Sequence, residues 1–210
     1  MTARCASRER PARIVFREDP AYRAPRRAFD VSLALVVLSV SLPIMLFAAV
    51  AIWLEDRGPV IFAQRRVGRF GRLFTMYKLR TMRRSECRDA LSPDTRDDSR
   101  ITRVGSWLRK TSIDELPQFF NVLRGDMAVV GPRPEMPFIV RRYQPWQHLR
   151  HLVKPGITGL WQITCRSRIP LHTPDATKID LVYIRSASLG MDRRIVLDTF
   201  RAIISAQGAY

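Results

Sequence analysis

The chain has 210 residues and a formal net charge of +17, with 36 Lys and Arg residues against 19 Asp and Glu residues. This length suits one domain with its own core. The charge predicts anionic partners: nucleic acid, an anionic membrane surface or a phosphorylated substrate. The three cysteines are scattered, which argues against a disulfide framework and a zinc site and fits a reducing compartment.

The first 56 residues predict attachment to a membrane. Residues 1–25 are arginine-rich with little apolar periodicity, and we expect a basic, poorly ordered leader. The next segment, residues 26–56, contains an uncharged run at 31–54 that is long enough to cross a bilayer as one helix.

The topology of this segment depends on its proline and its flanks. Pro43 lies near the middle and predicts a kink or break, while basic residues on both flanks favour keeping both on the cytoplasmic face. A re-entrant helix, broken at Pro43, meets both conditions, with the Ser41 hydroxyl as a partner for a freed backbone group. A plain transmembrane helix with a proline kink is the alternative; a cleaved signal peptide is weaker, because the basic leader is too long.

Residues 59–82 predict a small β-hairpin, because strand-forming residues flank two glycines that supply a turn. The strand formers are Val60, Phe62, Phe74 and Met76, and the turn glycines are Gly68 and Gly71. The acid- and serine-rich residues 83–104 predict a mobile loop that could act as a lid.

The stretch 105–135 contains two adjacent carboxylates, Asp114 and Glu115, among cations and before a rigid Gly-Pro-Arg-Pro turn. Such a pair suits a phosphorylated substrate, because one acid can attack or hold a metal while guanidinium groups neutralise phosphate oxygens. The alternative is structural. Ser112 and Glu115 have the spacing of a capping box before an amphipathic helix over 113–123, with Pro117 in or near its first turn.

The remaining chain predicts a fold of the α+β class that is mostly helical. Residues 136–152 are a helical candidate, and residues 154–162 read as a loop-to-strand passage. Residues 193–204 predict an amphipathic helix that packs on the core or lies in the membrane interface.

Five longer motifs occur in a fixed order along the chain. They are Tyr77-Lys78-Leu79-Arg80-Thr81-Met82, Leu108-Arg109-Lys110-Thr111-Ser112-Ile113-Asp114-Glu115-Leu116-Pro117-Gln118, Asn121-Val122-Leu123-Arg124-Gly125-Asp126-Met127, Val130-Gly131-Pro132-Arg133-Pro134 and Lys154-Pro155-Gly156-Ile157-Thr158-Gly159. Together they resemble the bacterial sugar transferases, the monotopic polyprenyl-phosphate phosphoglycosyltransferases of the exopolysaccharide-initiating type. The resemblance covers about residues 26–208.

The resemblance implies an enzyme that moves a sugar-1-phosphate from a UDP-sugar to undecaprenyl phosphate, releasing UMP, with Mg²⁺ and an aspartyl-phosphosugar intermediate. It also implies a re-entrant membrane helix in the bacterial inner membrane and a cytoplasmic catalytic domain at 57–210. No nucleic acid is expected as a partner, and a homodimer is compatible with the sequence. Galactose or glucose is the sugar that the resemblance favours over N-acetylated sugars.

The resemblance assigns roles by position. Asp114 would be the nucleophile and Glu115 the Mg²⁺ ligand, while Arg109 and Arg133 would grip phosphates, with Lys78 and Arg166 as further phosphate-binding candidates. Asp180 and Asp192 match family acids without an assigned role. The chain departs from the family where it has Thr164-Cys165-Arg166 in place of the common Asn-Gly-Arg, which affects the expected nucleotide or sugar pocket.

Two other functions are open at this point. A membrane-anchored basic module could bind nucleic acid or anionic lipid, as the charge suggests, with no need of the acid pair. A phosphohydrolase could use the same aspartate and release phosphosugar to water.

Overall fold

The computed structural model describes residues 20–83, 98–165 and 168–204. Helices dominate, and the strands form two separate two-stranded sheets. The elements are α1 Pro20–Asp56, β1 Ile61–Val67, η1 Arg69–Gly71, β2 Leu73–Leu79, α2 Arg103–Thr111, η2 Ile113–Glu115, α3 Gln118–Arg124, β3 Ala128–Val130, α4 Pro137–Val140, η3 Pro145–Leu152, β4 Gly156–Thr158, α5 Leu160–Thr164, α6 Pro174–Ser186 and α7 Leu189–Ile204.

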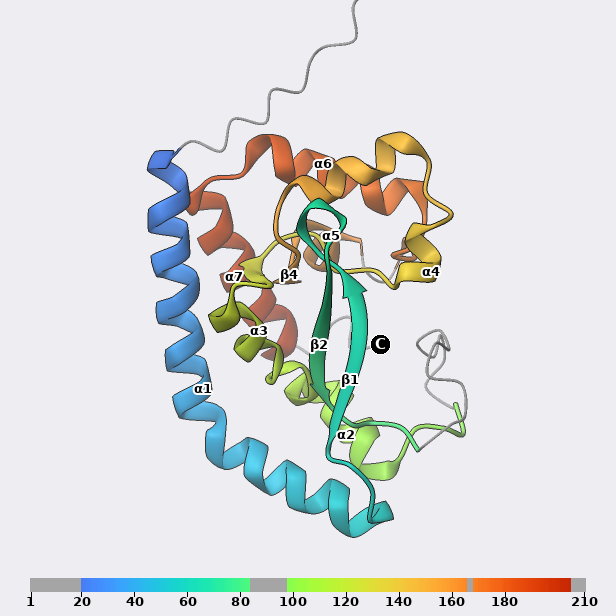
Figure 1. Ribbon diagram of the computed structural model, residues 1–210. Helices are drawn as coiled ribbons and strands as arrows, with labels where there is room; N and C mark the ends of the chain where they lie inside the picture. Colours follow the sequence, from blue (N-terminus) through green and yellow to red (C-terminus); the bar gives the residue numbers. More distant parts are fainter. Residues whose placement is uncertain (1–19, 84–97, 166–167, 205–210) are drawn as a thin grey trace, which may run out of the picture.

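Helix α1 runs along one side of the domain and then turns beneath it, while the β1–β2 hairpin stands in the middle and α6 lies at the opposite end (Figure 1). Within the described residues α1 is the one helix long and apolar enough to cross a membrane, and 17% of its most apolar window is buried inside the structure. Large apolar side chains are left exposed along it, for example Val40, Leu46 and Phe47. That surface needs a nonaqueous neighbour.

Both ends of α1 are tied to the same domain by polar contacts. Near its start, the Arg27 guanidinium donates to the carbonyl oxygens of Val122 and Leu123 at 2.6 and 2.8 Å, at the end of α3. Near its end, the Glu55 carboxylate accepts from the backbone N–H groups of Arg103 and Val104 at 2.8 and 3.2 Å, at the start of α2. Each contact satisfies backbone groups that a helix terminus leaves unpaired.

Two expectations about α1 need correction. The helix begins at Pro20, six residues before the expected start of the membrane segment at 26, because Tyr22 and Arg26 reach into the core and hydrogen-bond there to Asp192 and to Val130 and Tyr183. The helix is also continuous through Pro43, although it changes direction along its length (Figure 1).

Ser41 is one expected partner for a backbone group freed at the break. In the continuous helix its buried hydroxyl contacts the Met45 sulfur at 3.8 Å. The predicted break at Pro43 therefore remains a proposal.

The predicted hairpin is confirmed. Strands β1 and β2 pair antiparallel from Ile61–Leu79 to Val67–Leu73, and Gly71 takes a left-handed conformation at φ 76° in the turn. The pairing of β3 with β4 was not predicted: these short strands are parallel, with Ala128 opposite Gly156.

The helix predicted over 113–123 is wrong in its boundaries. Ser112 takes the left-handed conformation at φ 56° and ends α2, with no capping bond from its side chain, so the capping box does not form. A single 3₁₀ turn, η2, follows, and α3 begins only after Pro117. The left-handed residue reverses the chain, and the proline, which has no N–H, starts the next helix.

The later chain agrees with prediction in part. The helix predicted over 136–152 is divided into α4 and η3, since Pro145 begins a new segment. The strand predicted within 154–162 is β4, followed at once by α5. Helix α7 confirms the predicted amphipathic helix, whereas α6 was missed.

The main core lies where α1, α3, β3, β4, α6 and α7 meet. Asn121, fully buried on α3, joins this core to the hairpin: its amide nitrogen donates to the Thr75 carbonyl at 2.7 Å and its amide oxygen accepts from the Tyr77 N–H at 3.2 Å. This pair of bonds fixes β2 against α3, and thereby places the residue after Tyr77, Lys78, beside η2. The buried apolar residues are Ala34, Met76, Val122, Met127, Val129, Val130, Val153, Tyr183, Ile184 and Ile195.

Candidate active site

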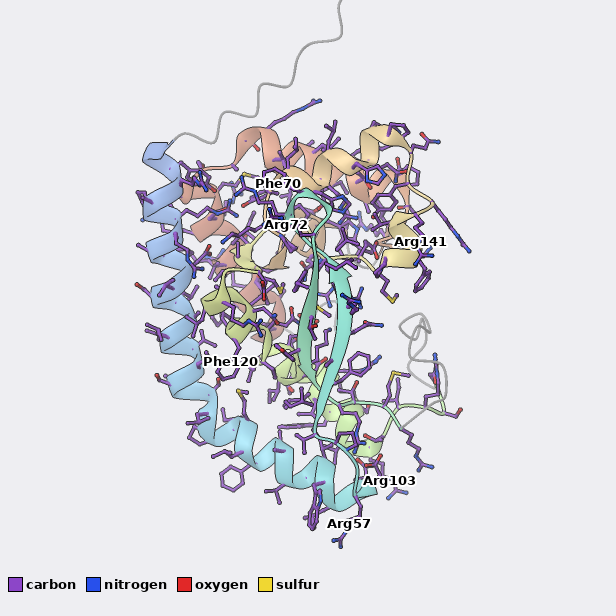
Figure 2. All side chains as sticks on the ribbon, in the orientation of Figure 1. Arg57, Phe70, Arg72, Arg103, Phe120 and Arg141 are labelled. Atoms are coloured by element: carbon purple, nitrogen blue, oxygen red, sulfur yellow. The ribbon has the colours of Figure 1, made fainter. Side chains whose placement is uncertain are left out.

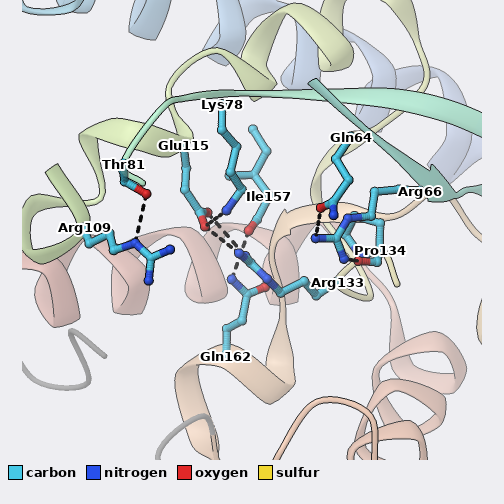
Figure 3. A network of polar contacts seen from close by, with 10 residues as sticks. All are labelled: Gln64, Arg66, Lys78, Thr81, Arg109, Glu115, Arg133, Pro134, Ile157 and Gln162. Atoms are coloured by element: carbon cyan, nitrogen blue, oxygen red, sulfur yellow. Dashed lines mark hydrogen bonds and ion pairs between the residues drawn. The ribbon is translucent and has the colours of Figure 1, made fainter. Parts of the chain in front are cut away.

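The acid pair lies on η2, between the end of α2 and the start of α3. Glu115 is held by two cations: its carboxylate accepts from Lys78 Nζ of β2 at 2.9 Å and from Arg133 Nη2 at 2.5 Å (Figure 3). Burial lowers the pKa of Lys78 despite the opposing field of Glu115. Burial also acts to lower the pKa of Arg133, but the carboxylates of Glu115, Asp114 and Glu135 together outweigh it and the net pKa is raised. These charge-assisted bonds fix both cations at one carboxylate.

Asp114 differs from its neighbour in having no hydrogen bond or ion pair with any residue that the structure describes. It is only 7% exposed. Burial raises the pKa of its carboxyl group, while the positive charge of Lys78 opposes that rise and the negative charge of Glu115 adds to it. The positive charges of Arg109 and Arg133 also oppose the rise in the pKa of Asp114. A carboxylate held by no partner within a cationic surround is available to react with a phosphorus centre.

Arg109 reaches the site from the last turn of α2. Its Nε donates to the Thr81 hydroxyl at 3.0 Å, which leaves the two terminal nitrogens free of bonds to the described residues (Figure 3). Helix α2 can approach this closely because residue 105 is glycine: a Cβ there would lie 2.0 Å from the Thr81 carbonyl oxygen. The start of α2 is fixed by the Thr102 hydroxyl, which accepts from the Gly105 N–H at 2.9 Å.

The 131–134 turn that presents Arg133 is held from behind by two buried guanidinium groups. Arg150 of η3 donates to the Arg133 carbonyl at 2.9 Å, and Arg66 of β1 donates to the Pro134 carbonyl at 3.2 Å. Arg150 also pairs with Asp180 of α6 at 2.6 Å and lies 3.9 Å from Glu135. Burial raises the pKa of Asp180 to about 6 despite this pairing. The turn is thus fixed at the carbonyl groups of Arg133 and Pro134.

A groove opens beside the acid pair, with a volume of about 210 Å³. Glu115, Ser112 and Lys110 form its polar end, and apolar side chains from α1, α3, α5 and α7 form its walls. Gln162 of α5 also lines it, held by a hydrogen bond from its amide nitrogen to the Ile157 carbonyl at 3.0 Å (Figure 3).

The structure brings together five of the residues that the sequence predicted for the site, from β2, α2, η2 and the 131–134 turn. Arg166 lies outside the described residues, as do the centre of the predicted 83–104 loop and most of the predicted leader. Thr164 and Cys165, where the chain departs from the family, close α5. The five residues are Lys78, Arg109, Asp114, Glu115 and Arg133.

Sequence reasoning missed the residues that support the site. Arg66 and Arg150 bind backbone carbonyls, a role that leaves no pattern of spacing in the sequence. Gln162 had a signal, since it follows the two glycines of the 154–162 passage. Those glycines allow close backbone contact: a Cβ on Gly156 would lie 2.1 Å from the Gly131 nitrogen.

Metal-binding capacity rests on the acid pair itself. Within the described residues there is no cluster of three or more His, Cys, Asp or Glu side chains that would hold a metal ion without help. Mg²⁺, however, is commonly bound by one or two carboxylates together with substrate phosphates and water. The Glu115 carboxylate, beside that of Asp114, fits this donor set.

The family model described as bacterial sugar transferase matches residues 21–206, and the chain belongs to that family. It is 41% identical over 199 residues to the UDP-N-acetylgalactosamine-undecaprenyl-phosphate N-acetylgalactosaminephosphotransferase of Aeromonas hydrophila, across 90% of this chain and 46% of that protein. It is 36% identical over 203 residues to the undecaprenyl-phosphate galactose phosphotransferase of Salmonella typhimurium, across 88% and 41%.

The chain therefore spans less than half the length of these two relatives. It is similar over a greater share of a shorter protein, the uncharacterized sugar transferase EpsL of Bacillus subtilis: 39% identical over 183 residues, across 87% of this chain and 89% of that one.

Proposed function

We propose that this chain transfers a sugar-1-phosphate from a UDP-sugar to undecaprenyl phosphate and releases UMP, as a first membrane step of exopolysaccharide or other surface-glycan synthesis. The names of the relatives supply the substrate classes. The observation that carries the proposal is the contrast between the two acids. Glu115 is paired with Lys78 and Arg133, whereas Asp114, between the same cations, has no described partner.

In the first step, a carboxylate oxygen of Asp114 attacks the phosphorus that bears the sugar. The bond from that phosphorus to the bridging diphosphate oxygen breaks, and the electron pair leaves with UMP. The product is an aspartyl-phosphosugar. Arg109 and Arg133 neutralise the phosphate oxygens, since a carboxylate attacks phosphorus poorly unless the charge of its target is cancelled.

In the second step, a phosphate oxygen of the lipid acceptor attacks the same phosphorus. The bond to Asp114 breaks and the free carboxylate returns, with a lipid-linked diphosphate sugar as product. Glu115 would hold Mg²⁺, which supplies charge neutralisation at the diphosphate and at the UMP leaving group. The bonds of Lys78 and Arg133 to Glu115 would then be shared with that ion.

We propose further that α1 is re-entrant and that the domain lies on the cytoplasmic face of the inner membrane. Both ends of the helix bind one domain, through Arg27 at the start and Glu55 at the end, which supports placing both ends on one side of the bilayer. Arg57 and Arg103 lie close to where α1 meets α2 (Figure 2), and the Arg57 guanidinium stacks 4.4 Å from the centre of the Trp53 ring. Such a pair suits the membrane interface, where tryptophan rings are enriched and an arginine can contact anionic headgroups.

The test of the reaction is UMP release by the detergent-solubilised chain with Mg²⁺, undecaprenyl phosphate and, in separate reactions, UDP-galactose, UDP-glucose and their N-acetylated counterparts. We expect repeated turnover to require the lipid, with galactose or glucose as the preferred sugar, and no more than one UMP per chain to be released without it. Repeated turnover without lipid would instead indicate a hydrolase. Well-folded protein that releases UMP from no donor would contradict the proposal.

The matched variants are Asp114→Asn and Asp126→Asn. Asp126 lies in the same segment, but its carboxylate is 31% exposed and has two long contacts, with Arg124 at 3.6 Å and with the Asn121 amide nitrogen at 3.5 Å. We expect Asp114→Asn to abolish release and Asp126→Asn to retain it. Equal release by the two variants would exclude the covalent role of Asp114.

A further inference from the structure

We infer that the groove beside Glu115 binds the isoprenoid chain of the lipid acceptor, with its phosphate held at the polar end. This inference rests on the proposed function and adds to it a place for the acceptor. The groove has a volume of about 210 Å³, is lined by Glu115, and has no part in the chemistry proposed so far.

The two ends of the groove differ in chemistry. At one end lie Glu115, Ser112 and Lys110, and the exposed Lys110 forms no ion pair with any residue that the structure describes. Most of the remaining lining is apolar, with Phe119 of α3, Ile163 of α5 and Val196 of α7 among it. Its other polar residues are Thr158, Gln162 and Thr199, and the two threonine hydroxyls bond to each other at 2.7 Å. A phosphate on a hydrocarbon chain has the same polarity, anionic at one end and apolar along its length.

The groove is also continuous with the membrane segment. Leu33 and Val37, both within the uncharged run of α1, form part of its wall. At the far side, Phe200 and Ile203 of α7 line the groove while remaining 49% and 40% exposed, so the groove is open rather than sealed. A chain lying in the bilayer beside α1 can therefore enter it sideways while its phosphate reaches the acids.

A UDP-sugar does not fit these walls, because its uridine and sugar carry many hydrogen-bonding groups that an apolar wall would leave unpaired. The donor is better served by the cationic side of the acid pair, where Arg109 and Arg133 lie. The uridine and the isoprenoid chain would thus lie on different surfaces, while the acceptor phosphate takes the position opposite the Asp114 oxygen that UMP vacates, as in-line displacement at phosphorus requires.

The experiment compares two truncations on α7. Phe200→Ala removes a wall residue of the groove, and Leu197→Ala removes a side chain that is 58% exposed on the same helix but does not line it. Both lose an exposed apolar side chain, so both should weaken contact of α7 with the membrane to a similar extent. KM is measured for undecaprenyl phosphate, for the short citronellyl phosphate and for the UDP-sugar.

We expect Phe200→Ala to raise KM for undecaprenyl phosphate about tenfold, equivalent to about 1.4 kcal/mol, and to leave KM for citronellyl phosphate and for the UDP-sugar near the parent values. Leu197→Ala should leave all three near the parent values. Equal changes for both lipids, or equal changes in both variants, would overturn the inference, as would no change in Phe200→Ala.

Failure of the proposed function gives a different result, because the parent chain itself would then release no UMP with either lipid. A photoreactive undecaprenyl phosphate analogue tests the location independently of turnover. We expect it to label peptides of α3 or α7, with labelling competed by undecaprenyl phosphate. Labelling confined to the outer face of α1 would overturn the inference.

Discussion

Two ionic clusters lie on either side of the 131–134 turn, and they are built from the same kinds of residue. The first joins Glu115 to Lys78 and Arg133, with side chains that are 17–20% exposed beside the groove. The second joins Arg150 to Asp180 and Glu135, with side chains that are 1–3% exposed. One turn separates a cluster that a substrate can reach from one that it cannot.

The difference teaches that access, rather than composition, decides what a carboxylate–guanidinium pair does. In the open cluster, the cations can exchange a carboxylate for phosphate oxygens as substrate enters. In the closed cluster, burial keeps a substrate from reaching the charges, and Arg150 also donates to the Arg133 carbonyl and to the Tyr143 hydroxyl. The closed cluster would thus position the open one.

The largest effect on stability should come from breaking the closed cluster. Arg150→Met leaves Asp180 and Glu135 buried without their cation and frees the 131–134 turn. Loss of one partner from a buried pair typically costs about 3–5 kcal/mol. Thermal unfolding in detergent should show a clear fall in Tm. An unchanged Tm with normal turnover would show that the cluster does not hold the turn.

The second effect is a dependence of the free energy of unfolding on pH, and it is centred on Asp180. Burial raises the pKa of this residue to about 6. A raised carboxyl pKa means that folding favours the neutral form, so this contribution to stability is complete below about pH 4 and is lost as the pH rises through 6. Two pKa units correspond to about 3 kcal/mol.

Asp180→Asn stays neutral in both states. The variant should therefore lose less stability than the parent between pH 4 and pH 7, whatever its absolute Tm. Glu135 shares Arg150 with Asp180, so the difference between the two curves reports the titration of the two coupled carboxyl groups together. Parallel curves for the two proteins would place the titration elsewhere.

The smallest effect in free energy is expected in the open cluster, as a loss of transition-state stabilisation rather than of folding stability. Glu115→Gln removes the charge that holds Lys78 and Arg133 and the proposed ligand for Mg²⁺. Turnover should fall about 10²-fold, which corresponds to about 2.7 kcal/mol, while Tm changes little because these side chains can reach solvent. Steady-state UMP release measures the first quantity. A Tm as low as that of Arg150→Met would remove the distinction between the clusters.

For the open cluster, the residues themselves singled out Glu115 and Arg133, whereas Lys78 entered only through the family resemblance. Asp114 and Glu115 are adjacent, and the prolines around Arg133 indicated a rigid turn. The hairpin was also predictable, since alternating strand formers flank Gly68 and Gly71. Local chemistry set these features, and local pattern revealed them.

The rest depended on contacts far apart in the chain. Arg150 has the same local appearance as any other basic residue of the segment, and only the fold brings it to Asp180, 30 residues on. The prediction of a capping box at Ser112 was wrong because the spacing of residue types does not reveal that a residue takes a left-handed backbone conformation. Helix α6 was missed although Thr173 and Pro174 are good start signals, with the Thr173 hydroxyl accepting from the Ala176 N–H at 3.4 Å.

The most direct test of the central claim is the intact mass of the protein after incubation with its preferred UDP-sugar and Mg²⁺ in the absence of lipid acceptor. We predict an added sugar phosphate on the parent chain, located on the peptide that contains Asp114, absent from Asp114→Asn and discharged when undecaprenyl phosphate is added. An adduct of the same mass on Asp114→Asn, or lipid-dependent turnover with no adduct on Asp114 at any stage, would contradict the account.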